Sequence, residues 1–142
     1  MNGVVPRSIA DVIALHAAAL RLVHDGEIPW VPSSTPGKSA RPLCFLRDGF
    51  VELLRMEPGV AMPPHRHTGV THVFQFEGWR RLDDGRLAGP GDYACEPAGH
   101  VDAWDVVGET ALLALVIVGG EVEMLADDGS IRLRIDAASR RR

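Results

Sequence analysis

The chain has 142 residues, of which 46% are hydrophobic and 24% charged, a size and composition that suit one domain with its own core. The formal net charge of -4 and the isoelectric point near 5.8 argue against a nucleic-acid or anionic-membrane partner. The longest apolar run, residues 111–118, is too short to cross a bilayer, and Cys44 and Cys95 are far from a CxxC spacing. We therefore expect a cytoplasmic protein without a disulfide scaffold or a zinc ribbon.

The first expected element is a helix over about residues 9–24. Ser8 and Asp11 form a plausible capping box, and apolar residues then recur with helical spacing. Asp25 and Gly26 end this pattern. Prolines and serines over residues 29–42 follow as an irregular arm. The expected organisation is an N-terminal helix and arm (1–40), a barrel (41–136) and a tail (137–142).

The remaining sequence predicts short β-strands separated by Asp-Gly, Pro-Gly and Gly-Gly turns. The expected strands cover residues 43–46, 50–56, 61–67, 70–77, 79–82, 92–96, 101–106, 111–118, 121–125 and 131–135. This regular spacing favours an all-β antiparallel barrel over alternating strands and helices.

Two histidines one residue apart, His65 and His67, are the most informative feature of the sequence. Because residues i and i+2 of a strand share a face, both imidazoles point the same way and can bind one metal ion. The alternative is that they are polar residues on a solvent-facing strand edge.

A second segment, GDYACEPAGHVDAW, has the same arrangement as the segment around His65 and His67: a glycine, a short strand, a turn and an inward polar residue. Five residues separate Gly59 from His65, and five residues separate Gly91 from the Pro97-x-Gly99 turn. These two segments resemble the paired motifs of the cupins, which implies a double-stranded β-helix, a jelly-roll-like antiparallel barrel, with the metal site inside it.

The cupin resemblance also implies a ligand set. His65 and His67 take the paired histidine positions, His72 takes the glutamate position, and Asp102 takes the last histidine position. The set keeps the three imidazoles and one carboxylate of the cupin motifs, which suits a divalent transition metal. His100 is the alternative ligand to Asp102, and His72 could instead be a core histidine or a proton relay.

A narrower resemblance, carried by IPWVP, ARPLCF, VELLRMEPGV, PPHRHTG, EGWRRL and GDYACEPAG, covers residues 28–118. These segments look like the 2,4'-dihydroxyacetophenone dioxygenase group of small cupins. That resemblance implies an Fe(II) enzyme that cleaves a carbon–carbon bond beside a carbonyl with O2, with Zn, Mn, Ni or Cu as alternative metals. The substrate would be an aryl hydroxyketone or a diketone, and the assembly a homodimer or homotetramer.

Further residues could complete such a site. Arg55, or Arg80 or Arg81, could orient an enolate or a carboxylate, although most strand arginines face water. Tyr93 and His100 are candidates for proton transfer, although a lone Tyr on an apolar strand often only packs. The expected aromatic substrate pocket consists of Phe74, Phe76 and Trp104.

Two other functions use the same residues. A non-catalytic cupin resembling the zinc-binding domain of certain anti-sigma factors would close the ligands around zinc. A metal-free cupin isomerase would instead use a histidine as the base.

Overall fold

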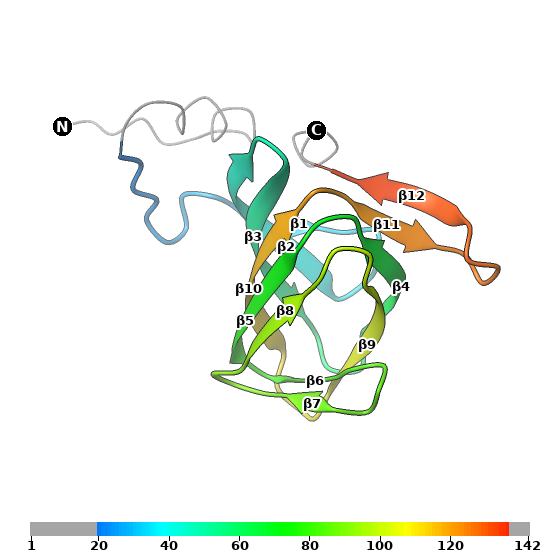
Figure 1. The fold of residues 1–142 in the computed structure, drawn as a ribbon. Coiled ribbons are helices and arrows are strands. Elements are labelled where there is room, and N and C mark those ends of the chain that lie inside the picture. The colour runs from blue at the N-terminus through cyan, green and yellow to red at the C-terminus, as the bar shows by residue number, and fades with distance from the viewer. Residues whose placement is uncertain (1–19, 137–142) are drawn as a thin grey trace.

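The computed structural model describes residues 20–136, which form two β-sheets (Figure 1). The strands of this part of the chain are β1 (Val31–Pro32), β2 (Lys38–Leu46), β3 (Gly49–Met56), β4 (Ala61–His67), β5 (Thr71–Glu77), β6 (Trp79–Arg81), β7 (Leu87–Ala88), β8 (Tyr93–Glu96), β9 (Val101–Val107), β10 (Leu112–Gly119), β11 (Val122–Leu125) and β12 (Ile131–Ile135).

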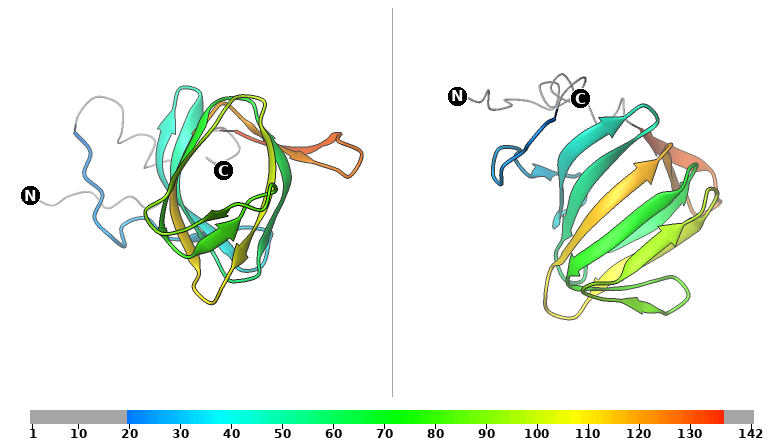
Figure 2. Two further views of the ribbon diagram at one scale, coloured as in Figure 1. Left: turned by 60° about the horizontal axis from the view of Figure 1, so that its bottom comes forward. Right: turned by 60° about the vertical axis from the view of Figure 1, so that its left-hand side comes forward.

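Each sheet has six antiparallel strands. The first sheet has the order β1-β2-β3-β10-β5-β8, and the second has the order β12-β11-β4-β9-β6-β7. The pairs β3–β10, β4–β9 and β5–β8 are nested around the β6–β7 hairpin, and they alternate between the two sheets. This is one long antiparallel ribbon coiled on itself, and Figure 2 shows its strands wrapped around a common interior. The all-β, jelly-roll prediction is confirmed.

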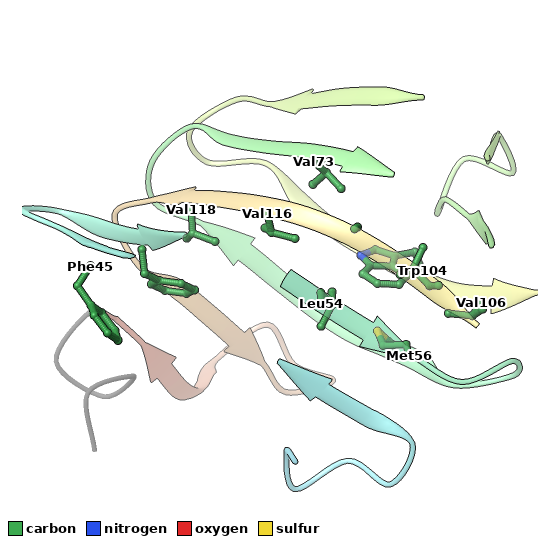
Figure 3. Close-up of a cluster of buried hydrophobic side chains, with 11 residues drawn as sticks. Phe45, Leu54, Met56, Val73, Trp104, Val106, Val116 and Val118 are labelled. Atoms are coloured by element: carbon green, nitrogen blue, oxygen red, sulfur yellow. The ribbon is translucent and has the colours of Figure 1, made fainter. Parts of the chain in front are cut away.

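Buried and partly buried residues alternate along β10, and its buried face forms an apolar wall of the interior. Leu112, Ala114, Val116 and Val118 are buried, whereas the residues between them are only partly buried. They join a core cluster with residues of four other strands, including Trp104 (Figure 3). Since fully burying one such side chain contributes about 1.5–3 kcal/mol, this cluster is a main source of the barrel's stability.

The inward and outward faces of β5 are the reverse of those expected from sequence. Thr71, Val73 and Gln75 are buried inside the barrel, whereas Phe74 and Phe76 lie on its outer face. Strand β5 pairs with β10 on one side and β8 on the other, so its face is set by the sheet rather than by the size of its side chains.

The start of the described chain also differs from expectation. Most of the expected helix, residues 9–19, lies outside the described residues, and residues 20–24 are not helical. Strand β1 and the start of β2 lie inside the segment expected to be an arm. Arg41 of β2 pairs with Asp25 and lies over the ring of Trp30, so the residues before β1 contact the first sheet. Residues 20–136 contain no helix long and apolar enough to cross a membrane.

One glycine is required where β2 turns into β3. Gly49 has a φ of 132°, and a Cβ atom there would lie 1.9 Å from the carbonyl oxygen of Val118. No side chain fits between these two backbones. The close approach lies at the end of the β3–β10 ladder, where Gly49 pairs with Gly119.

Candidate functional site

A cavity of about 70 Å³ lies between the two sheets. Its walls are mostly apolar and include Val73, Leu112, Val116 and Trp104. A volume of this size holds several water-sized groups or one small ligand. Polar side chains reach it from β2, β3, β4, β5, β6 and β8, so the cavity has the form of a binding site, with apolar walls and few polar contacts.

His65 and His67 both point from β4 into this cavity, as their spacing predicts. Their side chains are 4% and 5% exposed, and their ring centroids lie 5.0 Å apart. The Nδ1 atom of His65 lies 2.9 Å from the carbonyl oxygen of Pro63, and Nδ1 of His67 lies 3.0 Å from the Thr71 hydroxyl. Partners at both Nδ1 atoms fix the orientation of the two rings.

The state of His65 follows from its surroundings. A carbonyl oxygen only accepts hydrogen bonds, so Nδ1 of His65 carries the proton and Nε2 keeps its lone pair. Burial lowers the pKa of His65 to about 4, with a smaller contribution from the neighbouring His67. At neutral pH, His65 is therefore an uncharged imidazole with Nε2 available to bind a metal ion or a proton.

Glu96 on β8 also lines the cavity, although the sequence pattern did not single it out. Its Oε2 atom lies 2.9 Å from Nε2 of His67, and its Oε1 atom lies 3.7 Å from Nη1 of Arg80. Burial acts to raise the pKa of Glu96, but the hydrogen bond with His67 and the charges of His67 and Arg80 hold it below its ordinary value. The available signal was strand parity, because Ala94 and Glu96 alternate with the exposed Tyr93 and Cys95.

Arg80 is the buried cation of the site. It is 2% exposed, lines the cavity, and its guanidinium lies 5.1 Å from the ring centroid of Trp104. Its Nε atom has no hydrogen-bond partner within the described part of the chain. Burial lowers the pKa of Arg80, while Glu96 and Asp102 oppose that effect. The side chain thus brings a positive charge and a spare donor to the site.

Asp102 faces the interior, and His100 does not. Asp102 is 5% exposed and pairs directly with His65 across β4 and β9, whereas the His100 side chain is 40% exposed. Oδ1 of Asp102 accepts a 2.9 Å hydrogen bond from the Ala103 amide. Burial, and next the charge of Glu96, raise the pKa of Asp102. The expectation that Asp102 rather than His100 points inward agrees with this placement.

The structure does not bring the remaining candidates into the cavity. His72 lies on the outer face of β5, where Nδ1 contacts the Tyr93 hydroxyl and the two rings stack. Tyr93 is 58% exposed. Arg55 is also exposed and pairs with Glu57. The placement of His72 with the paired histidines is therefore corrected, and of the expected aromatic pocket only Trp104 lines the cavity.

The polar groups that line the cavity include imidazoles and carboxylates, which are common ligands of divalent transition metals. In the part of the chain that the structure describes, no group of three or more His, Cys, Asp or Glu side chains is arranged to hold a metal ion. The chemistry of the donors fits one nevertheless. His65 and His67 are buried with fixed Nδ1 atoms, and the carboxylates of Asp102 and Glu96 act electrostatically on one another beside them. Two imidazoles and a carboxylate suit Fe(II) or Zn(II).

Comparison with known protein families identifies the fold. Residues 18–119 match the profile of a family described as the ChrR cupin-like domain. The chain belongs to this cupin family. The matched residues include strand β4, which carries the two histidines, and strands β8 and β9, which carry Glu96 and Asp102. A comparison with curated proteins found no match.

Solved structures with the same fold include both enzymes and a regulator. An RmlC-like cupin from Ralstonia eutropha has 22% identity and a TM-score of 0.80, over 86% of this chain and 82% of that one. An acetylacetone dioxygenase from Acinetobacter johnsonii has 16% identity and a TM-score of 0.73, over 87% and 89%. The anti-sigma factor ChrR of Rhodobacter sphaeroides, solved in complex with SigE, has 19% identity and a TM-score of 0.57, over 64% and 48%. At these identities the likeness concerns the fold.

Proposed function

We propose that this cupin is a metal-dependent dioxygenase that uses O2 to cleave the carbon–carbon bond beside a carbonyl in a small diketone or hydroxyketone. His65, His67 and Asp102 would hold Fe(II). The observation that carries this proposal is the pair of buried imidazoles whose Nδ1 atoms are held by Pro63 and Thr71. Ligating histidines are usually fixed at their second nitrogen in this manner.

His67 differs from His65 because its Nε2 atom already contacts Glu96. A neutral His67 that donates from Nε2 to Glu96 accepts from the Thr71 hydroxyl at Nδ1. Since a hydroxyl both donates and accepts, Thr71 can equally accept from Nδ1 when Nε2 gives its lone pair to a metal ion. Thr71 therefore supports both states of His67 without moving.

When bound, the metal would polarise the substrate carbonyl and bring O2 beside the carbon that reacts. The chain's own residues supply the rest. Arg80 places a buried positive charge where a substrate oxygen becomes anionic, and Glu96 holds the arginine in position. The apolar walls formed by Val73 and Val116 exclude water and strengthen these electrostatic contacts.

The cavity walls favour an aliphatic substrate. Phe74 and Phe76, which would have favoured an aryl ketone, lie outside the barrel, and the lining holds the aromatic residues Phe50 and Trp104 among mostly aliphatic side chains. Together with the volume of about 70 Å³, this composition supports a small aliphatic β-diketone over an aryl hydroxyketone.

The second candidate is a non-catalytic zinc-binding cupin. It is favoured by the family match to the ChrR cupin-like domain and by the presence of two carboxylates beside two histidines. Four protein ligands would close the coordination sphere of zinc, as in structural sites, and leave no position for substrate. The two candidates therefore differ in whether a ligand can still reach the metal.

The test is metal analysis followed by O2 uptake. The purified protein is expected to retain about one transition metal per chain, and His67→Ala should lose it. His72→Ala is the matched control because His72 lies on the outer face. The iron-loaded protein, prepared without oxygen, should then consume O2 with pentane-2,4-dione. Retained metal together with no uptake for a panel of diketones and hydroxyketones would favour the zinc-binding candidate.

A further inference from the structure

Lys38, the only lysine in the sequence, lines the cavity. It starts β2, shares the strand face of the buried Ala40, and pairs with the fully buried Met56 on β3. Its Nζ atom lies 3.7 Å from the sulfur of Met62 on β4. Its charge is one of the influences that lower the pKa of His65. The ammonium group therefore acts inside the candidate site.

Lys38 and Arg80 reach the cavity from opposite edges of the barrel. Lys38 belongs to β2, near the β1 edge of the first sheet, and contacts β4 across the gap between the sheets. Arg80 belongs to β6, near the β7 edge of the second sheet, and contacts β8. A ligand in the cavity would thus lie between two positive side chains that approach from different sides.

The charges around the cavity favour an anionic ligand once a metal is bound. Lys38 and Arg80 of the lining are formally positive, and Glu52 and Glu96 are formally negative, so their charges cancel. Asp102, which lies opposite His65 on β9 but does not line the cavity, brings the formal charge beside the histidines to -1. A divalent metal ion would change this value to +1. Burying a net charge in an apolar cavity is unfavourable, and a monoanionic ligand would neutralise it.

We propose that Lys38 is a specificity-determining residue that binds a carboxylate on the substrate, so that the substrate class is a small β-diketo acid. This inference rests on the proposed function and refines it. In this arrangement the carboxylate of the substrate faces Lys38, and its two carbonyl groups lie toward His65 and His67. Lys38 is a compact, flexible cation that pairs with one carboxylate oxygen, which suits recognition at the edge of the site rather than chemistry.

The test compares two ligands that differ only in the carboxylate. Pentane-2,4-dione and 2,4-dioxopentanoate have the same dicarbonyl, and a methyl group of the first is a carboxylate in the second. Calorimetry on the metal-loaded protein without oxygen should give about 10-fold or tighter binding of 2,4-dioxopentanoate, the size of one charge-assisted hydrogen bond. Lys38→Met should remove this preference and leave binding of pentane-2,4-dione nearly unchanged.

The control is Arg55→Met, which removes an exposed cation outside the cavity and should keep the preference. Lys38→Arg should restore most of it, and Lys38→Gln replaces the methionine variant if that variant does not fold. An equal preference in the wild type and the charge-removed variant overturns the role of Lys38. Because binding is measured without turnover, lost O2 uptake with an intact preference would refute the dioxygenase and not Lys38.

Discussion

His65→Gln should flatten the pH dependence of stability in the metal-free protein. Burial lowers the pKa of His65 from 6.5 in the unfolded chain to about 4 in the fold. Between these values the unfolded state binds more protons than the folded state, so wild-type stability rises with pH through this window and is lost as the pH falls from about 6.5 to about 4. At 1.36 kcal/mol for each unit, the contribution is about 3 kcal/mol.

The assay is urea unfolding of both proteins with a chelator at several pH values in that window. The difference in unfolding free energy, wild type minus variant, isolates the titration of His65 from that of the carboxylates. It should fall by about 3 kcal/mol from pH 7 to pH 4. His72→Gln makes the same change on the outer face of the barrel and should follow the wild-type profile. A difference that is constant with pH would refute the buried, neutral state of His65.

Three further predictions concern the interior. Gln75→Leu should cost about 1–3 kcal/mol in urea unfolding, because its buried side chain donates to two backbone carbonyls. Trp104→Ala should cost about 3–5 kcal/mol, whereas Phe76→Ala on the outer face should cost less than about 1 kcal/mol, and equal costs would contradict the assigned faces of the strands. Asp102→Asn should raise the Tm of the metal-free protein by a few degrees, since it removes a buried charge beside Glu96, and it should weaken metal retention.

The sequence was sufficient to predict the fold because local signals agree with each other. Short strands, glycine turns and the paired motifs all point to one antiparallel barrel, and the expected strand over residues 61–67 has the same bounds as β4. The inward direction of His65, His67 and Asp102 also followed from the spacing. The oligomeric state and the compartment remain predictions.

The inward and outward faces of β5 could not be read from the sequence in the same way. Each face of β5 carries residues that could be buried, and the sequence analysis expected the face with Phe74 and Phe76 to lie inside. The structure instead places Trp104 of β9 and aliphatic residues of β10 in the interior, and Thr71 pairs with Glu96 across β5 and β8. That pairing places both side chains against His67, and it depends on long-range register rather than on local pattern.

The same register explains the charges of the candidate site. Asp102 stands opposite His65, and Glu96 stands opposite Thr71, so two carboxylates meet at the histidines. Their pKa values move in opposite directions: Glu96 is held below its ordinary value by His67 and Arg80, whereas burial and Glu96 raise that of Asp102. Glu96 thus already contacts His67 and Arg80, whereas the ion-pair contact of Asp102 is the longer one of 4.0 Å to the half-exposed His100. A divalent ion beside Asp102 would balance the negative charge of this carboxylate. For that reason, Asp102→Asn should stabilise the metal-free protein and weaken its binding of the metal.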